Sequence, residues 1–174
     1  MRKMLLLLFV LSSIGTRAQT DTVRLKQIAT QQKIVTDRPP QAVYFQLGGS
    51  GPFLSVNYDR RFGKRVNGLG FTTGIGFWGE TDASLFSIPL SLNYLAGRKT
   101  HFLELAAGTT FLAASVSGDY FSIDGGGTGL IYHASVGYRH QPTTGGFFFR
   151  GGISPLFGQG EYATWFYLGF GYNF

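Results

Sequence analysis

The sequence predicts an all-β chain folded as an antiparallel up-and-down barrel of about eight strands, and three observations lead to this fold class. Apolar and polar side chains alternate along eight segments, as they do along β-strands. Turn-forming residues, glycine above all, separate the segments. The composition also departs from that of a soluble domain, because charged residues make up 14% of the chain, against roughly 25% in a typical globular protein.

The alternating segments all lie after residue 41 and are each close to the ~9–11 residues that a tilted strand needs to cross a bilayer. No segment of helical period lies between them, which excludes a parallel βαβ architecture. No later run of apolar residues is long enough for a transmembrane helix. The eight segments are Ala42–Gly49, Phe53–Phe62, Leu69–Trp78, Leu85–Leu95, His101–Ala114, Gly129–Gln141, Phe147–Leu156 and Tyr162–Phe174.

The two faces of these segments differ in composition. One face carries large apolar and aromatic side chains and no charge, as in the series Val43, Phe45 and Leu47. The other face carries glycine, serine, threonine and asparagine but no lysine, whereas a water-facing surface is about 25–35% charged. Small polar residues suit the narrow interior of an eight-stranded barrel. The apolar face is therefore expected to meet lipid and the polar face to line the lumen of a transmembrane barrel.

Aromatic residues gather near both ends of the apolar face, as in the girdles of membrane barrels. We expect Phe53 and Tyr162 near one rim, and Tyr58 and Tyr172 near the other.

The N-terminal part of the chain predicts export. Arg2 and Lys3 precede an apolar run, and Thr16 and Ala18 supply small residues for a signal peptidase, so residues 1–18 are expected to be a cleaved signal peptide. The alternative, a membrane anchor, needs a longer apolar run. Residues 19–41 are polar and are expected to form a flexible periplasmic tail, and residues 42–174 the barrel.

Charge and cysteine content exclude several function classes. The formal net charge of +6 falls to +3 once the bases of the signal peptide are removed. The sequence also lacks the cluster of basic residues on one element that is typical of nucleic-acid-binding proteins. The chain has no cysteine, which excludes disulfides, a thiolate metal site and a lipidated cysteine. We therefore expect no nucleic-acid partner, no metal and no cofactor.

The last segment carries a pattern of Gly169, Tyr172 and Phe174. This pattern resembles the C-terminal signal that the barrel-assembly machinery reads in outer-membrane proteins. Together with the alternation over residues 42–174, it makes the chain similar to the small barrels of the OmpA and OmpX type. The resemblance implies the outer membrane of a Gram-negative bacterium and assembly by that machinery. It says little about the role, because these barrels include adhesins, structural proteins and lipid enzymes.

An even number of strands places both ends of the chain in the periplasm. The expected periplasmic turns then contain Lys64, Arg65, Arg98 and Lys99 and no acid. The expected outward loops contain no base and five acids. This acidic rim could bind lipopolysaccharide through bridging divalent cations or simply keep the loops soluble. The five acids are Glu80, Asp82, Asp119, Asp124 and Glu161.

Four charged residues fall on the lumen face: Asp59, Glu104, Arg139 and Arg150. Each lies a few residues from a periplasmic turn, so we expect them at one depth. Charges in so narrow a space must pair to offset their desolvation. The favoured interpretation is an ion-pair cluster that closes the lumen, and the alternative is a proton path or narrow pore.

A single element resembles a catalytic one. His133 and Ser135 have the His-x-Ser spacing of the outer-membrane lipid A deacylases, but Val136 follows in place of the usual Asn and no acid completes a triad. We therefore expect no catalytic residue. The sequence predicts a monomeric, non-enzymatic envelope protein, structural or surface-interacting, with a lipid A-modifying enzyme or a narrow pore as alternatives.

Overall fold

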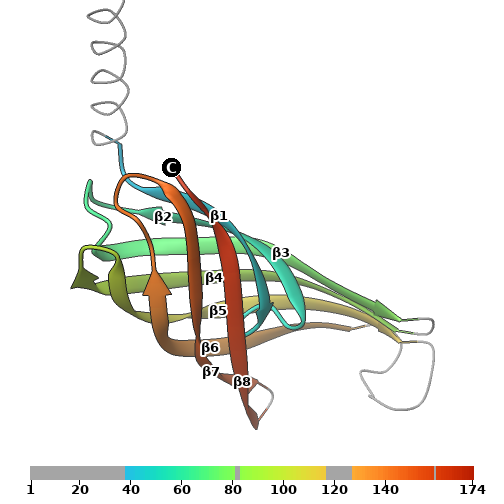
Figure 1. The fold of residues 1–174 in the computed structure, drawn as a ribbon. Coiled ribbons are helices and arrows are strands. Elements are labelled where there is room, and N and C mark those ends of the chain that lie inside the picture. The colour runs from blue at the N-terminus through green and yellow to red at the C-terminus, as the bar shows by residue number, and fades with distance from the viewer. Residues whose placement is uncertain (1–37, 81–82, 117–126, 159) are drawn as a thin grey trace, which may run out of the picture. The chain divides into compact units, whose positions relative to one another are not determined.

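The computed structural model describes residues 38–80, 83–116, 127–158 and 160–174, and these form eight β-strands in one closed barrel (Figure 1). The all-β prediction and the strand number are confirmed. The strands are β1 (Gln41–Gly48), β2 (Leu54–Arg61), β3 (Gly68–Glu80), β4 (Ala83–Arg98), β5 (His101–Val116), β6 (Gly127–His140), β7 (Gly146–Gly158) and β8 (Glu161–Asn173).

Each strand pairs antiparallel with the next one in sequence, and β8 pairs with β1 to close the ring. At the closure, Gln41 and Phe174 exchange two backbone hydrogen bonds of 3.1 and 2.8 Å. We call the end of the barrel with the β2–β3, β4–β5 and β6–β7 turns the inner end, after the expected periplasmic side. The opposite end is called the outer end.

The wall of the barrel is uneven in height. Strands β1 and β2 have 8 residues each, whereas β4 and β5 have 16 each and extend past them at the outer end (Figure 1). The β4–β5 hairpin is longer than the alternation predicted, because pairing continues to Arg98 opposite His101 and leaves only Lys99 and Thr100 as the connection.

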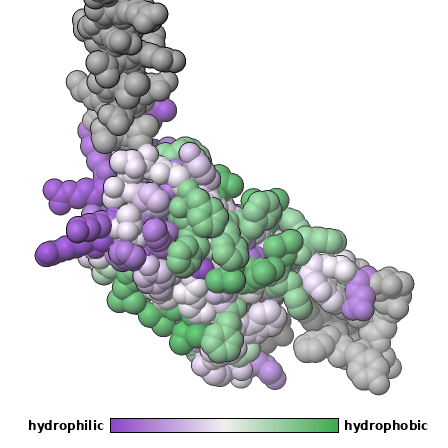
Figure 2. Space-filling model, in the orientation of Figure 1, coloured by the Kyte–Doolittle hydropathy of each residue, from purple (hydrophilic) through white to green (hydrophobic). Residues whose placement is uncertain are grey.

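The outer surface is apolar and the interior is polar, as the alternation predicted. Large apolar side chains such as Phe45, Phe77 and Phe166 are 61%, 63% and 79% exposed on the outside. Figure 2 shows hydrophobic side chains across the middle of the barrel and hydrophilic ones at the inner end. Within the described residues, no helix is long and apolar enough to cross a membrane. This polarity is inverted relative to a soluble domain and suits a wall that faces lipid.

The expected signal peptide and most of the expected tail lie outside the described residues. Strand β1 begins at Gln41, one residue before the predicted start of the barrel.

Candidate functional site in the barrel lumen

The inner half of the lumen contains the predicted charged residues together with one that was not predicted. Arg61 follows Asp59 at the next inward-facing position of β2, and both side chains are 1% exposed. The prediction of four lumen charges is therefore wrong, since Arg61 is a fifth. Its neighbour Arg60 points outward and is exposed, so the outer face is not free of charge at its inner edge either.

Asp59 is the centre of this charged cluster. Its two carboxylate oxygens accept hydrogen bonds from Nη2 and Nη1 of Arg139 at 3.1 and 3.2 Å. Arg61 donates to Asp59 at 2.7 Å, Thr72 at 2.9 Å and Asn93 at 2.6 Å. These partners come from β2, β3, β4 and β6, so one carboxylate connects opposite walls of the barrel.

Glu104 forms the second centre. It lies 3.4 Å from Nη1 of Arg139 and 3.3 Å from Nε of Arg150. Arg139 thus bridges the two carboxylates. The structure brings Asp59, Glu104, Arg139 and Arg150 into one connected set with Arg61, which we call the lumen cluster.

The lumen cluster holds three arginines and two carboxylates, an excess of one positive charge. Aromatic faces offset part of this excess through cation–π contacts. The guanidinium of Arg150 lies 5.0 Å from the ring centre of Tyr44 and 4.9 Å from that of Tyr167. The guanidinium of Arg139 lies 4.6 Å from that of Phe148. Arg150 also donates a hydrogen bond to the Tyr44 hydroxyl.

Buried apolar side chains also lie in the lumen. They form two groups, which the prediction of a uniformly small and polar interior did not include. The two groups are Ala42, Tyr44 and Phe148, and Val66, Leu95 and Phe102.

Glycines of β6 and β7 leave room in the lumen for one large side chain of β8. Tyr167 is 4% exposed, and a Cβ atom on Gly137 or Gly152 would collide with its hydroxyl. In the predicted assembly signal, Gly169 is buried opposite Gln46, while Tyr172 and Phe174 are exposed on the outer surface.

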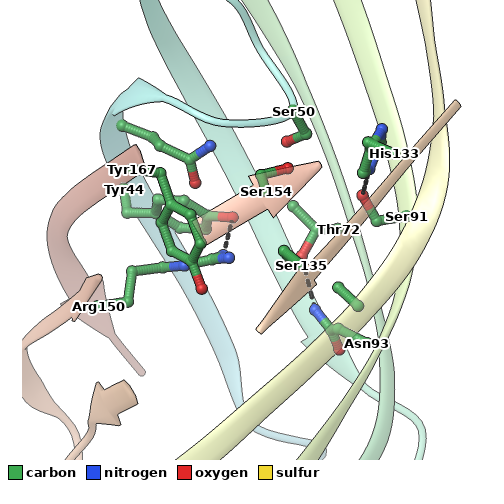
Figure 3. A pocket seen from close by; sticks show the side chains of 12 residues that line it. Tyr44, Ser50, Thr72, Ser91, Asn93, His133, Ser135, Arg150, Ser154 and Tyr167 are labelled. Atoms are coloured by element: carbon green, nitrogen blue, oxygen red, sulfur yellow. Dashed lines mark hydrogen bonds between the residues drawn. The ribbon is translucent and has the colours of Figure 1, made fainter. Parts of the chain in front are cut away.

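The described side chains in the outer half of the lumen are mainly hydroxyls, with one imidazole, and Arg150 of the lumen cluster borders the same cavity (Figure 3). His133 is 3% exposed; its Nε2 lies 2.7 Å from the Ser91 hydroxyl and its Nδ1 lies 3.3 Å from that of Thr110. Thr110 in turn donates to the backbone oxygen of Ser50 at 2.6 Å. Both ring nitrogens of His133 therefore have partners, and neither partner is Ser135.

Little space remains among these side chains. The cavity bordered by His133, Ser91, Ser135, Tyr167 and Arg150 has a volume of about 10 Å³, at the limit of what one water molecule needs. Figure 3 shows its lining side chains converging from several strands.

The β1–β2 turn folds over the outer half of the lumen. Gly49, Gly51 and Pro52 are buried, and Phe53 has a φ of +65°. The Phe53 ring stacks on Trp78 at 4.9 Å and meets Trp165 edge-on at 5.5 Å. Phe53 was predicted to open a strand and to lie in a lipid-facing girdle. It lies in the turn, one residue before β2, and is 40% exposed, while its ring contacts two residues at inward-facing positions.

The predicted acidic rim is only partly described. Glu80 and Glu161 are exposed at the outer end, whereas Asp82, Asp119 and Asp124 lie outside the described residues. Within the described part of the chain, no group of three or more acidic or histidine side chains is placed to hold a metal ion.

The fold and the inverted polarity define the class of structure: a closed, eight-stranded, antiparallel membrane barrel. Solved structures of outer-membrane proteins share this fold. The N-terminal barrel of OprF from Pseudomonas aeruginosa has a TM-score of 0.57 and 12% identity, over 78% of this chain and 96% of that one. Ail from Yersinia pestis, in complex with the heparin analogue sucrose octasulfate, has a TM-score of 0.50 and 14% identity, over 79% and 99%.

The predicted resemblance in fold to the small outer-membrane barrels is confirmed by these structures. No protein-family model and no curated protein matches the sequence.

Proposed function

We propose that this protein is an integral outer-membrane barrel with a non-enzymatic role in the cell envelope, structural or surface-interacting, and with a lumen closed by its own side chains. The observation that carries the proposal is the inverted polarity of the barrel. Exposed apolar side chains cover the outside, and charged side chains are buried inside. Such a surface is stable in lipid, whereas in water it would cause aggregation.

The outer membrane is the location that the fold favours, because closed barrels remove every unpaired strand edge from the hydrocarbon. The similar solved barrels are outer-membrane proteins. Residues 1–18 supply the expected export signal, and Gly169, Tyr172 and Phe174 the expected signal for the barrel-assembly machinery.

Closure of the lumen is supported at two levels. The lumen cluster spans the inner half from β2 to β7. The β1–β2 turn and the Phe53 contacts cover the outer half. An ion crossing the barrel would have to break buried ion pairs, which is costly. We therefore expect no steady conductance.

The absence of catalysis is proposed from the surroundings of the candidate groups. A nucleophilic serine needs a histidine base within hydrogen-bond reach and an acid that orients this base. His133 is bonded to Ser91 and Thr110, and the lumen carboxylates are paired with arginines. His133 also faces the lumen, away from the lipid substrate that the deacylases use.

The partners that fit the proposal are membrane lipids. Lipopolysaccharide would meet the acidic outer rim, which includes Glu80 and Glu161, through bridging divalent cations. We propose a monomer, since one chain closes the barrel without a second copy.

The proposal is tested by expressing the full sequence with its own leader in a Gram-negative host. We expect the protein in the outer-membrane fraction, no channel activity in planar bilayers, and lipid A that keeps all its acyl chains. Proteinase K added to intact cells should cut within residues 115–128 before the Lys64–Arg65 turn. Recovery as a soluble protein would overturn the proposed location, and steady conductance or loss of acyl chains would overturn the proposed role.

A further inference from the structure

Among the described residues, the exposed positive side chains at the inner end of the barrel lie on the side of β1 to β5, where Arg38 precedes β1. Arg60, Lys64, Arg65, Arg98 and Lys99 belong to β2, β4 and the two turns that connect β2 to β3 and β4 to β5, and all five are exposed. These strands are consecutive neighbours in the barrel. The β6–β7 turn contains no charged residue, and the described acids at the inner end are the buried ones. We call these five residues the basic rim.

Arg60 shows at what depth the basic rim lies. It alternates with Tyr58 of β2 and with Phe62, the residue after β2, on the outward side. The Phe71 ring lies 6.2 Å from that of Tyr58 and 6.0 Å from that of Phe62. An arginine that rises from such an aromatic band is tolerated where the hydrocarbon ends and the head groups begin. We therefore expect the guanidinium of Arg60 at the level of lipid phosphates.

Lys99 supplies an independent observation. It is the first residue of the two-residue β4–β5 turn and has a φ of +59°, a conformation that favours glycine. A lysine at this position costs free energy that a glycine would not. Lys99 therefore places an exposed charge in the turn at a position where glycine would suit the backbone better.

We propose that the basic rim binds the phosphate groups of anionic phospholipids in the leaflet at the inner end of the barrel. This inference rests on the proposed function, since it requires a barrel in a bilayer. Clustered cations at the membrane surface attract anionic lipids over a short range. The planar guanidinium groups of Arg60, Arg65 and Arg98 suit a phosphate in two-point hydrogen bonding.

The test uses the full chain refolded into vesicles of phosphatidylcholine with a minor fraction of phosphatidylglycerol. Spin-labelled versions of the two lipids report which one the barrel retains. We expect the protein to select phosphatidylglycerol, with a selectivity that falls as salt is raised. Replacing Arg60 or Arg98 with Gln should lower the selectivity about fivefold per charge at low salt. Equal retention of both lipids by the folded parent protein would overturn the inference.

Lys99→Gly separates a structural role from a binding role. It removes a charge and relieves the backbone, so we expect unchanged or higher resistance to urea in pure phosphatidylcholine together with lower selectivity for phosphatidylglycerol. Unchanged selectivity in Lys99→Gly, Arg60→Gln and Arg98→Gln would overturn the inference. Glu80→Gln and Glu161→Gln are the matched controls at the outer end and should not lower the selectivity.

Two further measurements distinguish a lipid phosphate from free phosphate and separate this inference from the proposed function. Inorganic phosphate and chloride at equal ionic strength should lower the selectivity for phosphatidylglycerol to the same extent. If phosphate alone abolishes the selectivity, the basic rim is a site for free phosphate and the lipid proposal is wrong. Failure of the parent to insert into any vesicle would refute the proposed membrane barrel, whereas insertion without lipid selectivity would refute this inference alone.

Discussion

The two halves of the lumen are filled in different ways. The inner half contains five charged side chains in direct contact and two apolar groups. The outer half contains hydroxyl groups, one imidazole and a backbone turn, with no charge among them. A buried charge that loses its partner is far more costly than a buried hydroxyl that does so. The same barrel interior thus combines strongly interdependent buried groups at its inner end with weakly interdependent ones at its outer end.

The largest effect is expected at the centre of the lumen cluster. Asp59→Asn removes the negative charge shared by Arg61 and Arg139, and it leaves three arginines facing one carboxylate. We expect a loss of about 3–5 kcal/mol in the free energy of unfolding, measured by urea titration of the refolded protein in vesicles. A parent-like unfolding midpoint would show that the inner half is not held by its charges.

The second prediction tests whether the charges act together. Glu104→Gln and Arg150→Gln each leave an opposite charge without one of its partners. The double variant removes one acid and one base, so its cost should be well below the sum of the two single costs. The same urea titrations measure this coupling, which we expect to be about 1–3 kcal/mol. Additive costs would mean that the lumen cluster is a set of independent contacts.

The third prediction moves to the outer half. Ser91→Ala leaves Nε2 of His133 without its partner at 2.7 Å, and we expect a cost of about 1–3 kcal/mol. Ser87 lies on the same strand and is 1% exposed, but its hydroxyl has no hydrogen-bond partner among the described residues. Ser87→Ala is therefore the control and should be neutral or stabilising. Equal costs for the two variants would show that the His133 contact contributes nothing.

The smallest effect concerns the β1–β2 turn. Phe53→Ala and Phe53→Gly both lose the contacts with Trp78 and Trp165, but only glycine relieves the backbone at a φ of +65°. We expect the glycine variant to be the more stable of the two by about 1–2 kcal/mol. In both variants the tryptophan emission spectrum should change in the same way. Neither variant should conduct ions, because the lumen cluster remains in place.

Alternation was sufficient to predict the barrel and to assign Asp59, Glu104, Arg139 and Arg150 to the lumen. A side-chain period of two carries that information directly. Arg61 was missed although it stands two residues after Asp59, on the same face of the predicted strand Phe53–Phe62. Phe53 was misplaced, since no local pattern marks a non-glycine residue with a positive φ.

The contact between Ser91 and His133 lies beyond any sequence pattern. The two residues belong to β4 and β6, which are not neighbours in the wall. They meet because both lie in register with Gly108 of β5, which has no side chain to separate them. Register across three strands, which the alternation along one strand does not reveal, decides such contacts.

The pairing of β1 with β8 has a consequence for how the chain acquires its structure. These two strands lie farthest apart in the sequence, and the ring stays open until their ladder forms. Until then β1 and β8 each present a row of unpaired amide and carbonyl groups, the surface on which chains aggregate. Bringing such distant segments together is slow because of the entropy lost in closing the loop. Folding intermediates in which β1 and β8 are unpaired are therefore prone to aggregation. A folding catalyst for this chain would act chiefly by shielding β1 until β8 pairs with it.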